Sequence, residues 1–450
     1  MANTLYRKAR RKEASEYVCS GCGFATPRWM GFCPQCRAES SLELSQSLHG
    51  SVAESRPLSE VVAQRQRRRA TGLGEFDRVL GGGMVPGSVI LVGGEPGVGK
   101  STLLLQLADS VARHGQVVLA SAEESGAQVA LRAERLSLSG DGVSLVATSE
   151  VASIVRTASA LDPVMLVVDS IQTVFCDDIE GSPGGLLQVR ESASRFIEYA
   201  KRSGVAVVLV GHVTKEGSIA GPKTLEHMVD VVMYLEGEGD GGLRLLRSLK
   251  NRYGSVNQVG VFTMEDKGMV EVSDPSGVLV EGHRTGAAGT VLFPVVEGRR
   301  SMLCEIQALV VSSALPQPRR SVKGLDSARL HQLLAVLERH AGVSLAEADV
   351  HVNVVGGLRL RDPALDLPVA LAVVSSVTDR PLPLTAAWGE VGLTGEVRAT
   401  THAERRAAEA GRFDPELVVK PGSNGVATVQ EALAIAGLLD PRSSRGTAVP

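Results

Sequence analysis

The chain has 450 residues and a mass of 47.2 kDa, a length that predicts more than one domain. Apolar residues make up 44% of it and charged residues 22%, a balance that excludes a disordered chain. No apolar run is long enough to span a membrane, and none follows the basic N-terminus as in a secretory signal. The formal charge is −3, yet residues 1–69 hold twelve Lys and Arg against six Asp and Glu, which makes an anionic partner for this end worth considering.

Four of the six cysteines form two Cys-x-x-Cys pairs near the N-terminus. These pairs, Cys19 with Cys22 and Cys33 with Cys36, can surround one Zn²⁺ with four thiolates. Four protein ligands leave no open coordination position, so we interpret the zinc as structural; a redox dithiol is the alternative use of one pair. Thiols clustered for a metal, without a disulfide framework, indicate a cytoplasmic protein.

Composition and predicted elements divide the chain into six segments. Residues 46–69 are rich in Ser, Glu, Gln and Arg without apolar periodicity, which is typical of a linker. Strands alternate with helices in both larger segments, which predicts an α/β class for the chain. The expected order is a zinc finger (1–45), a linker (46–69), a P-loop domain (70–272), a linker (273–285), a C-terminal α+β domain (286–440) and a flexible tail (441–450).

The central segment contains a glycine-rich loop between a short apolar strand, Ser88–Val92, and an apolar-periodic helix, Thr102–Val111. Strand, glycine loop and helix in this order form the context of a P-loop. Its backbone N–H groups close on phosphates at the positive end of the helix, so we predict ATP binding. The lysine of this motif reaches the β- and γ-phosphates and the serine coordinates Mg²⁺. The predicted nucleotide site consists of Gly94, Glu95, Pro96, Gly97, Val98, Gly99, Lys100, Ser101 and Thr102.

Three later apolar strands end in polar side chains that would complete this site. The first strand runs into Glu123 and Glu124, one of which would activate the attacking water, and the spacing does not separate them. The second ends at Asp169, which is placed to hold Mg²⁺ or its water together with Ser101. The third leads into Gly211–Thr214, whose polar residues are placed to sense the γ-phosphate.

Two loops of the central segment are long and rich in glycine, Cys176–Leu187 and Lys215–Thr224. Long loops on a rigid nucleotide-binding core tend to be functional. In an oligomeric ring they would line a channel for single-stranded DNA, with Lys215 and Lys223 as phosphate contacts.

Taken together, these motifs resemble the bacterial RadA (Sms) family of DNA repair proteins. The most specific segment is Lys250-Asn251-Arg252-Tyr253-Gly254, similar to the Lys-Asn-Arg-Phe-Gly signature of that family. Tyr253 in place of Phe keeps the ring and adds a hydroxyl. The other matching segments are Trp29-x-Gly31-x-Cys33-Pro34, the P-loop, Glu123-Glu124-Ser125, Val168-Asp169-Ser170-Ile171-Gln172-Thr173, Gly211-His212-Val213-Thr214-Lys215-Glu216-Gly217 and Leu225-Glu226-His227-Met228-Val229-Asp230.

The resemblance implies a RecA-like, DNA-stimulated ATPase that forms hexameric rings and drives branch migration as a DnaB-like motor. It also implies single-stranded and branched DNA as partners, recombination proteins such as RecA as further partners, and ATP, Mg²⁺ and Zn²⁺ as cofactors. Lys250 and Arg252 would then act in trans on the γ-phosphate of a neighbouring subunit. Three positions depart from the family pattern, Ala122, Gln258 and Thr263, and they do not change this expectation.

Residues 286–440 resemble the Lon-protease-like domain with which that family ends. Active Lon enzymes pair a Ser nucleophile with a Lys base. Here the corresponding segment Ala364–Asp366 contains no Ser, and no Lys follows Arg398 where the base would lie, so we do not expect proteolysis. The domain is expected to act as a ring-forming scaffold and a DNA-binding platform. Its predicted phosphate contacts are Arg319, Arg320 and Lys323.

The sequence therefore predicts an α/β protein with a RecA-like P-loop ATPase core, an N-terminal zinc knuckle and a C-terminal Lon-protease-like α+β domain without protease activity. The predicted function is a DNA-dependent ATPase of recombinational repair. The first alternative is a signalling ATPase similar to KaiC, without DNA stimulation. The second is an ATP-dependent Lon-type protease, which the missing Ser and Lys disfavour.

Overall fold

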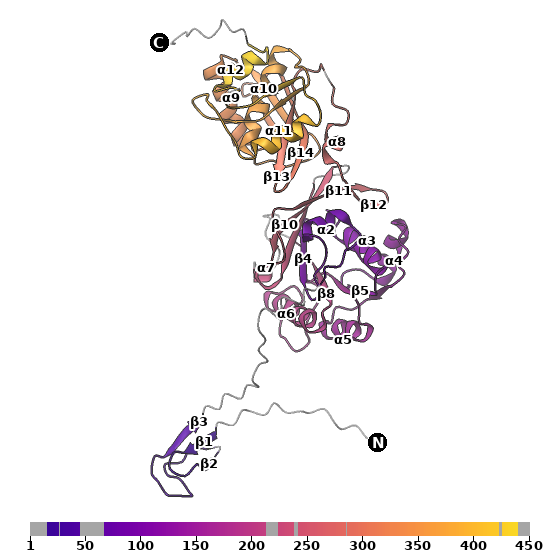
Figure 1. Ribbon diagram of the computed structural model, residues 1–450, viewed down its shortest axis with the longest axis vertical. Helices are drawn as coiled ribbons and strands as arrows, with labels where there is room; N and C mark the ends of the chain where they lie inside the picture. The colour runs from indigo at the N-terminus through magenta and orange to yellow at the C-terminus, as the bar shows by residue number, and fades with distance from the viewer. Residues whose placement is uncertain are drawn as a thin grey trace. The chain divides into compact units, whose positions relative to one another are not determined.

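Two compact units make up the chain in the computed structural model, one ending at Arg65 and the other beginning at Gln66 (Figure 1). The division lies inside the predicted linker 46–69. None of the helices in the described part of the chain has both the length and the apolar character of a membrane span. The residues that the structure describes are 16–26, 28–45, 67–212, 224–237, 242–284, 286–422 and 425–439. The predicted tail 441–450 lies outside them.

The first unit contains a three-stranded antiparallel sheet in the order β2-β1-β3. Its strands are β1 (Glu16–Cys19), β2 (Ala25–Thr26) and β3 (Leu42–Ser45). Cys19, Cys33 and Leu42 form its small buried core. So few buried apolar side chains cannot hold a fold of this size alone, which is why such modules depend on a metal.

A nine-stranded sheet in the order β12-β11-β10-β9-β4-β8-β7-β5-β6 forms the centre of the second unit. The six strands from β9 to β6 in this order are parallel, and β10, β11 and β12 continue the sheet in antiparallel fashion. The strands are β4 (Val89–Gly94), β5 (Val117–Ser121), β6 (Val143–Val146), β7 (Met165–Asp169), β8 (Ala206–His212), β9 (Val231–Glu236), β10 (Leu243–Asn251), β11 (Val259–Glu265) and β12 (Gly268–Glu271).

Helices cover both faces of this sheet, which explains why its parallel strands are continuous apolar runs. In β4, Ile90 and Val92 face the core that α2 and α3 complete, while Val89 and Leu91 face the core of α5 and α6. The P-loop strand is therefore anchored on both sides. The helices are α2 (Gly74–Leu80), α3 (Lys100–Ala112), α4 (Gly126–Arg135), α5 (Val151–Leu161), α6 (Leu186–Ser203) and α7 (Thr224–Met228).

The C-terminal domain of the second unit is built on a six-stranded sheet in the order β15-β16-β14-β13-β17-β20, with a separate β18-β19 pair. Helix α10 is buried almost all round because it packs on β13 and β14 and contacts α9 and α12. The elements are β13 (Thr290–Glu297), β14 (Arg300–Ser312), β15 (Arg320–Lys323), α9 (Ser327–Ala341), β16 (Ala348–Val354), η1 (Pro363–Leu365), α10 (Asp366–Thr378), β17 (Thr385–Ala387), β18 (Glu390–Val391), β19 (Val397–Arg398), α11 (Ala403–Gly411), β20 (Leu417–Val419) and α12 (Val429–Ile435).

The predicted linker 273–285 differs from the sequence prediction because it contains helix α8 (Pro275–Val280), which packs against β14. Ser276 is fully buried there, donating its hydroxyl hydrogen to Glu409 at 2.6 Å and accepting one from the Leu303 backbone N–H at 2.9 Å. The segment is short and polar enough to suggest a tether, but its serine and apolar residues are used in packing. The ATPase core is thus joined to the C-terminal domain by a structured element.

Candidate nucleotide site and zinc site

The loop after β4 has the backbone shape that a phosphate-binding loop needs. Gly97 and Gly99 adopt φ values of 81° and 107°, a region that side chains disfavour. At the φ of Gly99, just before α3, any other residue would be strained whatever the space around it. The loop therefore keeps its backbone close to the N-terminal end of α3, where N–H groups and the helix dipole favour phosphate.

Lys100 lies at the first position of α3 and is 5% exposed. Its Nζ donates to the carbonyl oxygens of Gly94 at 2.8 Å and Glu95 at 3.0 Å, which spans the loop. Burial lowers the pKa of Lys100, and the nearby Asp169 and Glu123 carboxylates oppose this shift. The lysine, the loop and two acidic side chains are therefore neighbours.

Strand register explains why these side chains meet. Gly94 of β4 pairs with His212 of β8, and Ser121 of β5 pairs with Asp169 of β7. The backbone N–H of Ala122 also donates to the Asp169 carbonyl at 2.8 Å. All four strands are parallel, so their carboxyl ends meet at one edge of the sheet, where open α/β sheets bind ligands.

The two adjacent acids have different surroundings. Glu123 accepts a hydrogen bond from the hydroxyl of Ser170, the residue after Asp169. Glu124 instead pairs with the guanidinium of Arg132 on α4. Only Glu123 is thus directed toward the strand end that carries Asp169, a difference that spacing alone did not reveal.

The residues present fit a magnesium nucleotide. A Cβ on Gly94 would lie 2.7 Å from the Leu235 carbonyl oxygen of β9 and 3.0 Å from Val98 Cγ1, so the loop folds closely back on its own first residue. Ser101 follows Lys100 on α3, and its hydroxyl with the Asp169 carboxylate is the oxygen set that Mg²⁺ prefers. A bound Mg²⁺ would neutralise charge on the phosphates and orient them.

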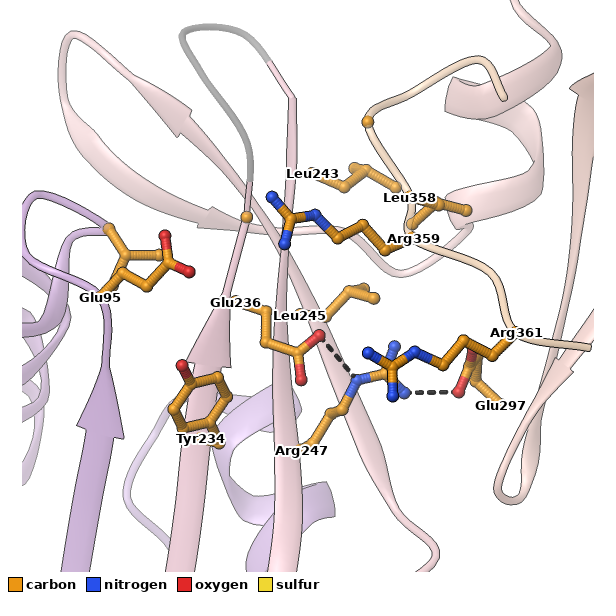
Figure 2. Close-up of a pocket in the computed structure, with 13 residues that line it drawn as sticks. Glu95, Tyr234, Glu236, Leu243, Leu245, Arg247, Glu297, Leu358, Arg359 and Arg361 are labelled. Atoms are coloured by element: carbon orange, nitrogen blue, oxygen red, sulfur yellow. Dashed lines mark hydrogen bonds and ion pairs between the residues drawn. The ribbon is translucent and has the colours of Figure 1, made fainter. Parts of the chain in front are cut away.

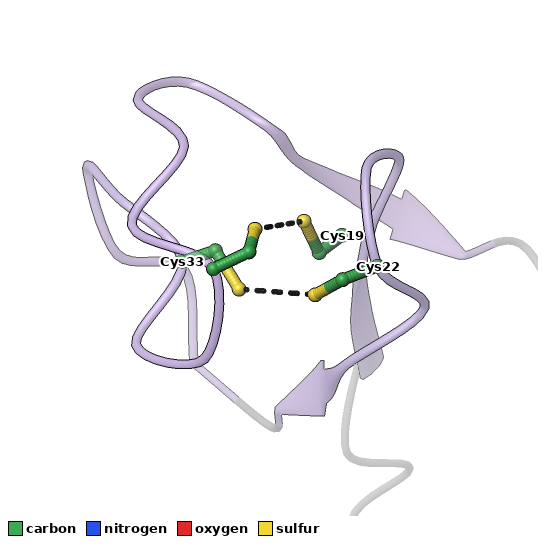
Figure 3. Close-up of side chains that lie close together, drawn as sticks. Cys19, Cys22 and Cys33 are labelled. Atoms are coloured by element: carbon green, nitrogen blue, oxygen red, sulfur yellow. Dashed lines mark hydrogen bonds between the residues drawn. The ribbon is translucent and has the colours of Figure 1, made fainter.

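The four N-terminal cysteines fit a zinc ion. Their Sγ atoms all lie within 4.8 Å of one another, and Cys19 to Cys36 and Cys22 to Cys33 are both 3.6 Å apart (Figure 3). Thiolates bound to one tetrahedral Zn²⁺ are roughly 3.8 Å apart, given Zn–S bonds of about 2.3 Å. Cys19 Sγ lies 3.2 Å from Ser41 Oγ, and the hydrogen bonds around this thiol lower its pKa to about 6. Against a backbone hydrogen bond with Phe24, burial and the other three sulfurs raise the pKa of Cys22. Zinc binds thiolates, so metal binding at these four sulfurs would release protons.

Comparison with known proteins agrees with both sites. Residues 59–218 match an AAA domain, and residues 17–43 match a rubredoxin metal binding domain. The DNA repair protein RadA of Pseudomonas aeruginosa is 47% identical over 91% of this chain and 93% of its own. The chain belongs to the RadA family. The DNA repair protein RadA of Escherichia coli is 43% identical over 94% of this chain and 95% of its own.

Family membership confirms the predicted resemblance and the predicted fold class, a P-loop ATPase core with an N-terminal zinc module and a mixed α/β remainder. A crystal structure of a KaiC-like protein from Pyrococcus horikoshii is also similar, at 20% identity and a TM-score of 0.40. The similarity covers 46% of this chain and 99% of the KaiC-like chain.

The signature segment typical of the RadA family lies at the end of β10, away from the P-loop. Lys250 pairs with Val232 of β9, which in turn pairs with Leu91 of β4. Leu91 precedes the end of β4 by three residues, or roughly 10 Å of strand. Lys250 therefore lies toward the amino ends of the parallel strands, opposite the edge that carries the nucleotide site.

In the single chain, Lys250 donates from Nζ to three backbone carbonyls at the C-terminal end of α7. Its acceptors are Glu226 at 2.7 Å, His227 at 3.1 Å and Val229 at 2.8 Å. An ammonium has three donors, so this set uses all of them. Burial, with the neighbouring Arg252 cation, lowers the pKa of Lys250.

Arg252 is held by the buried Asp230. Its Nη1 lies 3.3 Å from Asp230 Oδ1, and its backbone N–H donates to the Asp230 carbonyl at 3.0 Å. The other carboxylate oxygen accepts from the Val89 N–H at 3.0 Å, at the start of β4. Asp230 is the last residue of the family-like segment Leu225–Asp230, and spacing alone assigns no role to its carboxylate.

The structure describes one of the two loops predicted to contact DNA, Cys176–Leu187, but not the other, Lys215–Thr224, apart from its last residue. Lys215 and Lys223, with Val213 and Thr214, lie outside the described residues, as does the side chain of His212. The other loop, Cys176–Leu187, is fixed to α6 by the buried Gln188, whose amide nitrogen donates to the carbonyls of Ile179 and Cys176. Its long glycine-rich sequence therefore forms a defined shape.

The predicted DNA contacts of the C-terminal domain lie on and beside β15. Lys323 and Arg319 are exposed. Arg320 is half-buried, and its guanidinium donates to backbone carbonyls of Leu345 and Ala348. Lys323 and Arg319 are thus placed to meet phosphate, while Arg320 is engaged in holding the strand; all three assignments remain predictions.

The segment that resembles the Lon nucleophile region is occupied by structural contacts. Asp366 is 3% exposed, pairs with Arg329 of α9 and accepts from the Val391 N–H at 3.0 Å. Ser375 of α10 accepts from the Gly289 N–H at 2.9 Å and donates to the Arg380 carbonyl at 2.6 Å. These contacts give Asp366 and Ser375 structural roles, so neither side chain requires a catalytic Ser–Lys pair to explain its presence.

A cavity of about 520 Å³ separates the P-loop from the C-terminal domain (Figure 2). Arg247 of β10 bridges its two sides through ion pairs with Glu236 of β9 and Glu297 of β13. Glu95 of the P-loop and Arg359 of the C-terminal domain point into it from opposite sides. The nucleotide loop is therefore next to the C-terminal domain, which the sequence did not predict.

Proposed function

We propose that this chain is a DNA-dependent ATPase of recombinational repair, which promotes branch migration as a ring-shaped, DnaB-like motor on single-stranded DNA. Membership of the RadA family and the fit of the P-loop region to a magnesium nucleotide support the ATPase. The printed names of the relatives support DNA repair as the setting. Its cofactors would be ATP, Mg²⁺ and a structural Zn²⁺. The protein would act in the cytoplasm.

One observation carries the oligomeric part of the proposal. Lys100, Asp169 and Glu123 gather at the carboxyl edge of the sheet, while Lys250 lies toward the opposite edge. A cation there is too distant to neutralise charge on the nucleotide of its own chain. Only a neighbouring subunit, placed head to tail as in a ring, would bring Lys250 and Arg252 to a γ-phosphate.

In the proposed reaction, the loop N–H groups and Lys100 hold the phosphates, while Ser101 and Asp169 hold the metal. Glu123 orients the attacking water and accepts its proton, because its carboxylate points to the Asp169 strand end. Lys250 of the adjacent subunit leaves its α7 contacts and Arg252 leaves Asp230, and both cations neutralise charge as the γ-phosphoryl group departs. The long loops and the exposed Arg319 and Lys323 would grip DNA.

The steady-state ATPase rate with and without single-stranded DNA, at two salt concentrations, tests this proposal. We expect DNA to raise turnover in the wild type, higher salt to weaken that effect, and Lys100→Ala to lose it. Turnover that ignores DNA at both salt concentrations would contradict a DNA motor and favour a signalling ATPase similar to KaiC.

A further inference from the structure

Ser170 is the residue that connects the two acidic strand ends of the site. It is fully buried, directly follows Asp169, and its Oγ is hydrogen-bonded to Oε1 of Glu123. An ionised carboxylate has no proton to give, so the serine hydroxyl is the donor. A residue with no exposure of its own therefore holds the side chain proposed to activate water.

Thr173 leaves the hydroxyl proton of Ser170 directed at Glu123. Its Oγ1 donates to the Ser170 carbonyl at 3.0 Å and accepts from the Ser170 backbone N–H at 3.3 Å. The one hydroxyl proton of Thr173 is used on that carbonyl, so it is not directed at Ser170 Oγ, 3.5 Å away. Ser170 keeps its own proton for Glu123.

We propose that Ser170 is the positioning residue of the hydrolytic site, fixing the Glu123 carboxylate relative to the strand that carries Asp169. This inference rests on the proposed function, in which Glu123 activates water. Through the hydroxyl, the group that acts on water and the group that holds the metal move together. Misplacement of a reacting group by about 1 Å can cost about 100-fold in rate, so one lost hydrogen bond is enough to matter.

Ser170→Ala should therefore lower kcat by roughly 10- to 100-fold while nucleotide affinity, measured with a fluorescent ATP analogue, stays within about twofold. Ser192→Ala is the matched control, because Ser192 of α6 is also fully buried but its hydroxyl contacts Cys176, which is not one of the proposed site residues. It should keep the wild-type kcat. A fall in nucleotide affinity equal to the fall in kcat would show a merely structural role and overturn the proposal.

A double-mutant cycle with Glu123→Gln makes the test specific. If Ser170 acts through Glu123, single-turnover hydrolysis by the double variant is no slower than by Glu123→Gln alone. Effects that multiply would overturn the proposal. Thr173→Val, which keeps the shape but removes the hydroxyl, gives a second route into the same cycle if Ser170→Ala fails to fold, and it should show the same non-additivity.

Failure of this inference and failure of the proposed function give different results. A wild type without ATPase activity, or a normal rate in Glu123→Gln, contradicts the proposed mechanism and this inference with it. An active wild type and an impaired Glu123→Gln, beside a normal Ser170→Ala, overturn only the role of Ser170.

Discussion

The carboxylate of Glu124 forms an ion pair with the guanidinium of Arg132, eight residues further along the chain. Both side chains are partly exposed, at 32% and 24%. The pair ties the loop after β5 to helix α4, whose N-cap is the neighbouring Ser125. Glu124 is therefore engaged with a helix, while Glu123, one residue earlier, faces Ser170.

Glu123→Gln should lower the ATP turnover rate by about 10²- to 10⁴-fold, the range that general bases contribute. Glu124→Gln, its matched control, should change turnover by at most a few-fold, because only a partly exposed ion pair is lost. Both rates are measured as DNA-stimulated phosphate release at saturating ATP. A larger loss in Glu124→Gln than in Glu123→Gln would reverse the assignment.

Lys250→Ala should abolish most of the DNA-stimulated turnover while nucleotide binding persists, because the cation is proposed to serve a neighbour. Mixing Lys250→Ala with Lys100→Ala subunits should restore activity above either variant alone. In randomly mixed rings, about one interface in four joins an intact P-loop to an intact Lys250. Lys201→Ala, an exposed lysine of α6, is the control and should behave like the wild type.

A mixture no more active than its components would argue that Lys250 acts within its own chain. In that case its three bonds to the α7 carbonyls would be its whole role, and the thermal stability of Lys250→Ala should fall accordingly.

Sequence patterns predicted the elements that depend on local signals. The P-loop, the strand ends at Glu123 and Asp169, and the paired cysteines are each set by residues close together in the chain. The contacts that distinguish Glu123 from Glu124 are not set locally. Ser170 lies 47 positions after Glu123, and no spacing rule predicts that this pair forms a hydrogen bond. The prediction that residues 273–285 form a linker was wrong for a related reason. Helix α8 is recognisable only from its packing on β14, which is distant in the sequence.

Cys33→Ser should reduce bound zinc from one per chain to near zero, because the remaining three thiolates hold it less tightly. The thermal transition of the second unit should not change, since that unit has separate cores of its own. Zinc is measured by release to a chromogenic chelator. Cys176→Ser, which removes a buried thiol elsewhere, should keep its zinc. A large drop in the main transition of Cys33→Ser would show that the zinc supports more than the first unit.

The pH dependence of thermal stability should show that the pKa of the buried Lys100 is lowered in the folded chain. Burial lowers its pKa, so the folded chain releases this proton at a pH at which the unfolded chain still holds it. Where the unfolded state binds more protons, stability rises with pH, here between the lowered pKa and the ordinary value of 10.5. The Tm of the nucleotide-free wild type should therefore rise relative to that of Lys100→Met as the pH increases from 8 toward about 10. A Tm difference that is independent of pH would contradict a buried, charged Lys100.

A buried ion pair joins Glu75 of the ATPase core to Arg300 of the C-terminal domain, and their side chains are 5% and 10% exposed. Arg300 also donates to the carbonyls of Val272 at 2.9 Å and Ser273 at 3.0 Å. Arg300→Met leaves the buried Glu75 carboxylate with only the half-exposed Arg78 as a cation, at 3.3 Å. Removing one partner of a buried pair costs up to about 3–5 kcal/mol.

This loss should appear as a lower Tm in thermal unfolding. The double variant Glu75→Gln/Arg300→Met should lose less than the sum of its single variants, because no carboxylate is then left buried and Arg78 is half-exposed to water. Arg299→Met, at an exposed neighbouring position, should leave the Tm unchanged. An Arg300→Met protein as stable as Arg299→Met would mean that packing of α8 on β14, and not this ion pair, holds the two domains together.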